Sequence, residues 1–360
     1  MNIAFINATH IWSGAKTWCL INAEELSKRR HNVVIYARPG TLIDKARQQG
    51  LDAIAYPFGA DFSPKAIAYF IREFKRRRID ICICNITKDM RTAGIAARIL
   101  GIPILQHIGA AGDLRDSAKE SLTTRVLAPS FITPSEFVRK GFLVKYPLAA
   151  KFPLRAIHPG VSIPDVTELR TTAGTPRRII MTSRFAEGKG HADLVRALSR
   201  LHNEGFDFIC TLCGSGELEQ KIRSQVTEAG LEKKVIFAGF ASDVYEHLLK
   251  NDIYVFPSRN EGLGLSLVEA MAAGLPCIAK RGSGPEEIWP AERTSMLIPE
   301  EDTGLELYVQ LRRLLSMNDS ELINEGRVFY EHARRAFNKA IQTEALGSYL
   351  KDIVTNRGIR

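Results

Sequence analysis

The chain has 360 residues, of which 45% are apolar and 25% charged, and a net charge of +9, values that exclude a disordered or low-complexity protein and predict two globular domains. No apolar run reaches the roughly 18 residues of a membrane-spanning helix, and the first residues lack the basic and apolar regions of a signal peptide, so we expect a cytoplasmic protein. The positive charge lies in residues 1–160, which carry 24 basic and 12 acidic residues, whereas the remainder carries 25 and 28.

Short apolar runs alternate with longer amphipathic stretches in the first half of the chain. Helical patterns include 17–29 and 64–77, and the expected strands are 3–7, 33–36, 79–84, 104–106, 131–133 and 154–157. This alternation predicts a parallel sheet built from β-α-β units. We therefore expect a first α/β domain over residues 1–162.

The pattern restarts after a stretch rich in Pro, Thr and Gly, which predicts a linker over 163–177. The expected strands of the second half are 179–182, 208–213, 235–237, 253–256 and 277–279. They predict a second α/β domain over 178–335. Helical sequence continues to about residue 354, and its last helix, within 336–360, can pack on either domain.

The most informative segment follows the expected strand 253–256, and its candidate ligand contacts are Glu261, Gly262, Leu263, Gly264 and Leu265. Glycine lacks a Cβ, so the backbone there can approach a ligand closely. A helix is expected to begin near Leu265, and its free N–H groups favour a phosphate. Because ligands of open α/β sheets bind at the carboxyl ends of strands, this loop is a candidate binding site.

Glu269 lies within the apolar helix that follows this loop. A carboxylate on an apolar helix is costly unless it is paired or solvated. A ribose diol would supply two hydroxyl donors to Glu269, whereas the alternative is a surface glutamate on the polar side of the helix. Glu261 lies eight positions earlier, in the loop, from which it can accept the hydroxyl groups of a sugar.

A second candidate turn follows strand 179–182 and holds Arg184 and Lys189 before a helix that begins near His191. Two cations beside a helix N-terminus suit a diphosphate, and they stabilise the charge that builds on a leaving nucleotide. The alternative is a basic turn on the surface.

Three weaker patterns also follow strands. Gly214 and Gly216 belong to a G-x-G-E sequence, which either contacts a ligand or forms a tight strand-to-helix turn. Gly14 opens a helix after the first strand, so the backbone there can approach a phosphate or a sugar. His107 ends strand 104–106, where a structural histidine is the alternative to a ligand contact.

The basic clusters 75–78 and 28–30 have two interpretations. Cations suit helix C-termini, so both clusters can be solvated helix ends. They can also bind an anionic partner, which would be a membrane leaflet or an acidic acceptor. We expect no nucleic acid partner, because no recognised binding motif is present.

These segments together resemble the glycosyltransferases of family 4, whose GT-B fold has two Rossmann-like α/β domains facing across a cleft. The resemblance covers nearly the whole chain and is strongest over residues 178–288. The paired glutamates of the family match Glu261 and Glu269, and its R-x4-K-G turn matches Arg184 and Lys189. Its G-x-G-E loop matches Gly214 and Gly216, its early glycine loop matches Gly14, and its sugar-facing histidine matches His107. The chain departs from the family at Ser13, where a glycine is frequent, and at Lys16, near the usual position of an acidic residue.

The resemblance implies roles for these residues. The residues expected to take part in catalysis are Glu261, His107, Arg184 and Lys189. Arg184 and Lys189 would hold the donor diphosphate, Glu269 would bind the ribose, and the base would lie near Phe240. The last helix would return to the N-terminal domain.

The reaction implied by the resemblance is a retaining transfer from a nucleoside diphosphate sugar, with a UDP- or GDP-sugar favoured, to a glycan or glycolipid acceptor. The expected setting is bacterial cell-surface polysaccharide or lipopolysaccharide synthesis, with peripheral contact to the inner face of the cytoplasmic membrane. The resemblance implies that no metal is required. It implies no other cofactor either, and the nucleotide sugar counts as a co-substrate. The alternatives are a sugar-nucleotide epimerase on the same fold and a non-catalytic sugar-nucleotide-binding protein.

Overall fold

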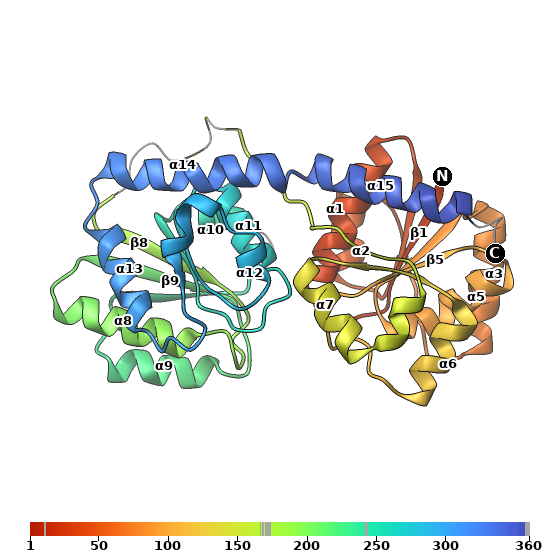
Figure 1. Ribbon diagram of the computed structural model, residues 1–360, viewed down its shortest axis with the longest axis horizontal. Coiled ribbons are helices and arrows are strands. Elements are labelled where there is room, and N and C mark those ends of the chain that lie inside the picture. Colours follow the sequence, from red (N-terminus) through yellow and green to blue (C-terminus); the bar gives the residue numbers. More distant parts are fainter. Residues whose placement is uncertain (11, 166, 168, 170–173, 242–243, 357–360) are drawn as a thin grey trace. The chain divides into compact units, whose positions relative to one another are not determined.

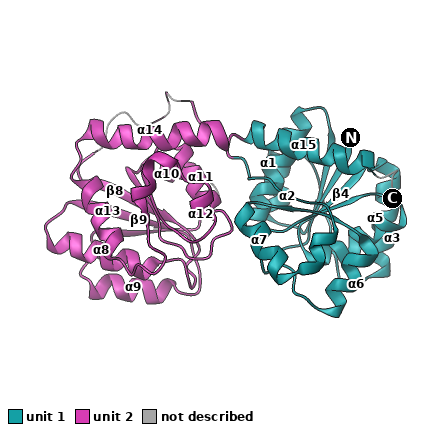
Figure 2. Ribbon diagram, viewed as in Figure 1, with its two compact units in different colours: residues 1–160, 339–360 teal, residues 161–338 magenta. Residues whose placement is uncertain are grey.

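The computed structural model describes all residues except 11, 166, 168, 170–173, 242–243 and 357–360 (Figure 1). The chain divides into two units, which Figure 2 distinguishes by colour. Unit 1 comprises Met1–Gly160 with Lys339–Arg360, and unit 2 comprises Val161–Asn338. In the predicted linker 163–177, residues 166, 168 and 170–173 lie outside the described residues, and the last residue already belongs to a strand.

Unit 1 contains a seven-stranded parallel sheet in the order β3-β2-β1-β4-β5-β6-β7. Its strands are β1 (Asn2–Asn7), β2 (Asn32–Ala37), β3 (Asp52–Ala55), β4 (Ile81–Cys84), β5 (Ile104–His107), β6 (Ser130–Thr133) and β7 (Leu154–Ala156). The chain moves outward from β1 to β3 and then resumes at β4 on the other side of β1. The topological switch point of this sheet therefore lies between β1 and β4, where ligands of such folds bind.

Helices cover both faces of the unit 1 sheet, which explains why its central strands are apolar on both sides. One core contains Ile3 and Phe5 together with α1 (Gly14–Lys28), α2 (Thr41–Gln48) and α15 (Lys339–Thr355). The other core contains Ala4 and Ile6 together with α3 (Pro64–Arg77), α5 (Ile95–Ile99) and the end of α6 (Ala118–Leu127). A smaller cluster joins Phe131 to α7 (Glu136–Lys145), and the short elements are α4 (Thr87–Asp89), η1 (Met90–Gly94) and η2 (Pro147–Lys151).

Unit 2 contains a six-stranded parallel sheet in the order β10-β9-β8-β11-β12-β13. Its strands are β8 (Arg177–Thr182), β9 (Phe208–Cys213), β10 (Val235–Gly239), β11 (Ile253–Phe256), β12 (Cys277–Lys280) and β13 (Leu297–Ile298). Strand β8 pairs with both β9 and β11, so the switch point of this sheet lies between β8 and β11.

The helices of unit 2 are α8 (His191–Asn203), α9 (Glu219–Glu228), α10 (Tyr245–Leu248), α11 (Leu265–Ala272), α12 (Gly284–Glu287), η4 (Ala291–Met296), α13 (Leu305–Leu315) and α14 (Asp319–Ala336). A capping box starts α14, because the Asn318 side chain accepts from Glu321 N at 3.0 Å and the Glu321 carboxylate accepts from Asn318 N at 2.9 Å. The chain then enters α15, whose Tyr349 hydroxyl donates to the Phe131 carbonyl of unit 1 at 3.1 Å.

The predicted fold class of two parallel α/β sheets is confirmed, but the sequence prediction misses two strands. Strand β3 lies at the edge of its sheet and buries only Ala53. Strand β13 has two residues and is also an edge strand. Both are wrongly left out for the same reason, because a short edge strand lacks the continuous apolar run that identifies a central parallel strand.

Candidate functional site

The loops after β8 and β11 meet at the switch point of unit 2. The Arg259 N–H donates to the Gly188 carbonyl at 2.8 Å, and the Ser258 hydroxyl lies 3.5 Å from the Lys189 carbonyl. Gly190 has a φ of +78°, and a Cβ at this position would lie 2.3 Å from the Pro257 carbonyl oxygen. Glycine is therefore required at position 190 by the close approach of the two loops.

Lys189 and Glu261, two of the predicted catalytic residues, form an ion pair between these loops. Their side chains are 26% and 18% exposed, so the pair is partly shielded from water yet open to a ligand. Arg184 lies in the same loop as Lys189, is exposed, and makes no ion pair with any described residue. The structure thus brings Lys189 together with Glu261 and leaves the side chain of Arg184, five positions before Lys189, exposed.

The loop after β11 is also held in place by α12, the short helix that follows β12. The Gly284 N–H donates to the Glu261 carbonyl at 2.9 Å, and a Cβ on Gly284 would lie 2.3 Å from the Gly262 carbonyl oxygen. Leu263 is buried beneath the loop, and Leu265 is half-buried at the start of α11. The predicted segment around Glu261 is therefore fixed by backbone contacts with the loop after β8 and with the start of α12.

Helix α11 begins at an open N-terminus. Its N-cap is Gly264, with a φ of +92°, which offers no side-chain cap, and the first turn contains no acidic residue. The first-turn N–H groups of such a helix favour an anion. Glu269 lies half-buried one turn further along α11.

Tyr254, which the sequence analysis did not single out, fixes the start of α11 against β8. Its hydroxyl lies 2.9 Å from the Thr182 hydroxyl and 3.0 Å from the Ser266 hydroxyl. Burial raises the pKa of Tyr254, and the Glu269 carboxylate acts in the same direction, which places Glu269 near this buried network. A hydroxyl-bearing residue in an otherwise apolar central strand is the sequence signal that could have identified it.

His191 and Lys280 are two further buried polar residues close to the loops. Burial, followed by the charge of Lys189, lowers the pKa of His191 to about 4, and its Nε2 lies 3.1 Å from the Ser183 hydroxyl. Lys280 is fully buried, and its ammonium lies 2.7 Å from the Asp193 carboxylate. These residues join β8, α8 and β12 beneath the candidate loops.

Gly214 and Gly216 contact the backbone of the loop after β8. A Cβ on Gly214 would lie 1.9 Å from the Ser183 carbonyl oxygen, and one on Gly216 would lie 2.3 Å from the Phe185 carbonyl oxygen. The Phe185 N–H also donates to the Ser215 carbonyl at 2.9 Å. Close packing of two loops is thus sufficient reason for both glycines, and their contact with a donor stays a prediction.

Phe240, the predicted neighbour of the base, follows the edge strand β10 and is 56% exposed. An exposed aromatic ring at the carboxyl end of a strand is available for stacking, but residues 242–243 beside it lie outside the described residues.

Gly14 and His107 belong to unit 1. Gly14 is the first residue of α1, and a Cβ there would meet no atom within 4 Å. His107 ends β5 and stacks on Trp18 of α1, with ring centroids 4.4 Å apart and an interplanar angle of 23°. Burial lowers the pKa of His107 to about 4, so the ring is neutral at pH 7. Its buried Nδ1 has no hydrogen-bond partner among the described residues.

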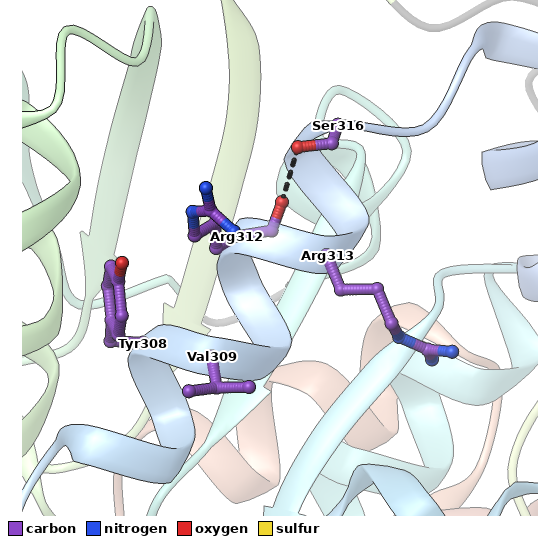
Figure 3. Close-up of a pocket in the computed structure, with 5 residues that line it drawn as sticks. All are labelled: Tyr308, Val309, Arg312, Arg313 and Ser316. Atoms are coloured by element: carbon purple, nitrogen blue, oxygen red, sulfur yellow. Dashed lines mark hydrogen bonds between the residues drawn. The ribbon is translucent and has the colours of Figure 1, made fainter.

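The remaining features lie outside these loops. Figure 3 shows a surface hollow on α13, lined by Tyr308, Val309, Arg312, Arg313 and Ser316, none of which is a predicted site residue. Within the described residues, no three His, Cys, Asp or Glu side chains gather in a way that could hold a metal ion. In the same part of the chain, no helix combines the length and apolarity needed to cross a bilayer.

Two family models match the chain. The model described as "Glycosyltransferase Family 4" matches residues 12–163, and the one described as "Glycosyl transferases group 1" matches residues 168–329. Among curated relatives, the amylovoran biosynthesis glycosyltransferase AmsK of Erwinia amylovora is 28% identical over 51% of this chain and 47% of its own length. The lipopolysaccharide core biosynthesis glycosyltransferase LpsE of Rhizobium meliloti is 32% identical over 34% of each chain. The matched region spans about half or less of the length of these relatives.

Two solved structures match 98–99% of the chain. A glycosyltransferase from Rickettsia africae has a TM-score of 0.81 and 17% identity, with 99% of both chains covered. Anabaena HepE in complex with UDP-glucose has a TM-score of 0.78 and 19% identity, with 98% of this chain and 100% of that chain covered. These likenesses show that both units together form the GT-B fold.

Proposed function

The chain belongs to glycosyltransferase family 4, and from this premise we propose that it transfers a sugar from a nucleoside diphosphate sugar to a glycan or glycolipid acceptor, with retention of anomeric configuration. The observation that carries the proposal is the Lys189–Glu261 ion pair, which joins two loops at the switch point of unit 2. A cation and a carboxylate held together at this edge of the sheet match the two chemical ends of such a donor, its diphosphate and its sugar hydroxyls.

The donor is held by unit 2 in this proposal. Lys189 and the exposed Arg184 neutralise the diphosphate, and the uncapped N-terminus of α11 adds backbone N–H donors. Glu261 accepts hydroxyl groups of the transferred sugar, and the half-buried Glu269 accepts those of the ribose. When the diphosphate binds, the Lys189 ammonium exchanges part of its interaction with Glu261 for the phosphate oxygens.

The transfer step breaks the bond between the sugar C1 and the diphosphate oxygen and forms a bond between C1 and the acceptor oxygen. The proton of the acceptor hydroxyl moves to the departing diphosphate. Arg184 and Lys189 stabilise the negative charge that develops on the diphosphate, so no metal ion is required for that purpose. His107, neutral at pH 7, donates to or accepts from a sugar hydroxyl without adding charge.

The proposed setting is the synthesis of bacterial cell-surface polysaccharide. Its support is the named role of the relatives AmsK and LpsE in amylovoran and lipopolysaccharide core synthesis. A UDP-sugar is the favoured donor, because the structural neighbour HepE binds UDP-glucose. The basic excess of residues 1–160 supports a peripheral contact with an anionic membrane surface.

A thermal-shift screen against UDP-, GDP-, ADP- and CMP-sugars tests the donor site. A selective ligand at a hundredfold excess over its Kd stabilises the fold by about 2.7 kcal/mol. We expect a shift with the sugars of one base in the wild type and in the control Lys250→Ala, whose side chain is exposed, and a reduced shift in Lys189→Ala. Shifts that are equal in Lys189→Ala and wild type would remove Lys189 from the site.

Product analysis then separates transfer from the alternatives. We expect free nucleoside diphosphate to accumulate with a glycan acceptor present and to fall by at least tenfold in Lys189→Ala. Nucleotide release that needs no glycan acceptor would indicate the epimerase instead. Donor binding without any turnover would indicate a binding protein.

A further inference from the structure

Three lysine or arginine side chains are buried in the described part of the chain, and two of them meet a carboxylate. Lys280 lies 2.7 Å from the Asp193 carboxylate, and Arg91 pairs with both Asp61 and Glu120. Lys16 is 6% exposed, and within the described residues its side chain makes one hydrogen bond, from Nζ to the His10 carbonyl at 3.3 Å. Buried charges are normally paired, but no carboxylate among the described residues pairs with Lys16.

The electrostatics of Lys16 agree with this geometry. Burial lowers the pKa of Lys16, and no charged group among the described residues raises it again. A neutral carbonyl at 3.3 Å offsets little of the cost of removing an ammonium group from water. An anion at this position would offset that cost.

The backbone around Lys16 also favours an anion. Lys16 lies in the first turn of α1, whose N-cap residue Ser13 makes no side-chain capping bond and whose first turn contains no acidic residue. The space beside Gly14 is open. The first turn of α1 and the Lys16 ammonium, which belongs to that turn, therefore both favour a negative charge.

This position lies at the switch point of unit 1, where β1 runs beside β4 and leads into α1. Trp18 of the same helix stacks on His107 at the end of β5, so α1 begins next to the carboxyl edge of the sheet. Ligands of open α/β sheets bind at that edge.

We propose that Lys16 and the N-terminus of α1 bind an anionic group of the acceptor, a carboxylate as in a uronic acid or a phosphate ester. The inference rests on the proposed function and extends it from an acceptor glycan of any kind to an acidic one. Residues 1–160 contain 24 basic and 12 acidic residues, and this excess of positive charge also favours an acidic acceptor. The donor diphosphate is the other source of such an anion, and in the proposed function it is already met by Arg184 and Lys189.

Binding of simple sugars to the full chain tests the inference. The probes are glucuronate and glucose 6-phosphate, with glucose as their neutral counterpart and UDP as the probe for the donor. The variant is Lys16→Met, which keeps the buried aliphatic stem and removes the charge. The control is Lys65→Met, which removes an exposed lysine from the first turn of α3, a helix whose N-cap Ser63 is already bonded to Ala66 N.

We expect calorimetry to show tighter binding of an acidic probe than of glucose, a loss of about tenfold or more in Lys16→Met, and no change in Lys65→Met. The unliganded Lys16→Met should melt at or above the wild-type temperature, since a desolvated charge has been removed. A lower melting temperature with unchanged binding of the acidic probes would show that Lys16 is structural and overturn the proposal.

Binding of UDP distinguishes an anion of the donor from an anion of the acceptor. We expect UDP to bind Lys16→Met as tightly as wild type, because its diphosphate belongs to unit 2. If Lys16→Met weakens UDP and leaves the acidic sugars unchanged, the anion is that of the donor and the acceptor assignment is wrong. If the wild type binds UDP but prefers neither acidic probe to glucose, the proposed function stands and this inference fails.

Discussion

Substituting Gly190 by alanine tests whether the contact between the loops after β8 and β11 builds the site. The substitution has two costs. A residue with a side chain at a φ of +78° costs roughly 1–2 kcal/mol, and a Cβ 2.3 Å from the Pro257 oxygen forces the two loops apart, for which overpacking costs typically about 1–3 kcal/mol. The expected loss of unfolding free energy is therefore about 2–5 kcal/mol.

Gly188 provides a matched control in the same loop. Its φ is also +78°, but a Cβ there would meet no atom within 4 Å, so Gly188→Ala carries the backbone cost alone. The difference between the two variants isolates the loop contact, at about 1–3 kcal/mol, and each kcal/mol lowers the melting temperature by about 2–4 °C in a domain of this size.

The assay is urea unfolding of both variants, followed by the nucleotide-sugar thermal shift. We expect Gly190→Ala to be the less stable variant and to lose the ligand-induced shift, because Lys189 moves away from Glu261. Gly188→Ala should keep that shift. Equal stability and equal ligand response in the two variants would refute the argument that the close approach at Gly190 positions the site.

Three further predictions concern pH, a buried charge and the membrane. Burial is the main cause that lowers the pKa of His107 and the pKa of His191 to about 4. Between about pH 4 and 6.5 the unfolded state therefore binds more protons than the folded state, and the free energy of unfolding falls as the pH drops through that window. Urea midpoints at pH 5 and 7 should differ less in His191→Gln than in wild type, and an unchanged difference would contradict the lowered pKa. Lys280→Met should cost about 1.5–3 kcal/mol, because the buried Asp193 carboxylate loses its bond to Lys280 and keeps only its pairs with Arg196 and Arg259. Lys250→Met should stay within about 0.5 kcal/mol, and denaturant midpoints check both values. In sedimentation with vesicles, the protein should bind anionic lipid at low salt and be released at high salt, and equal binding to neutral vesicles would rule out the electrostatic contact.

The sequence by itself determined the fold class and the loops in which to look. Apolar runs such as 253–256 and 208–213 coincide with β11 and β9, because a strand buried on both faces of a parallel sheet must be apolar throughout. The glycines at 214, 216 and 264 also stand out in the sequence, because they lie in segments that follow expected strands and lack a Cβ. Polar residues that directly follow such strands indicated where the carboxyl edge of each sheet lies.

Only the tertiary structure decided which of these residues meet. Lys189 and Glu261 are 72 positions apart, and the pairing of β8 with β11 brings them into contact. Folding also turns Gly214 and Gly216 toward the backbone of a neighbouring loop and buries Lys16 with no carboxylate of the described residues beside it, which no local pattern indicates. Strand propensity and periodicity act over a few residues, whereas ion pairing, burial and close backbone approach are set by contacts between segments that are distant in sequence.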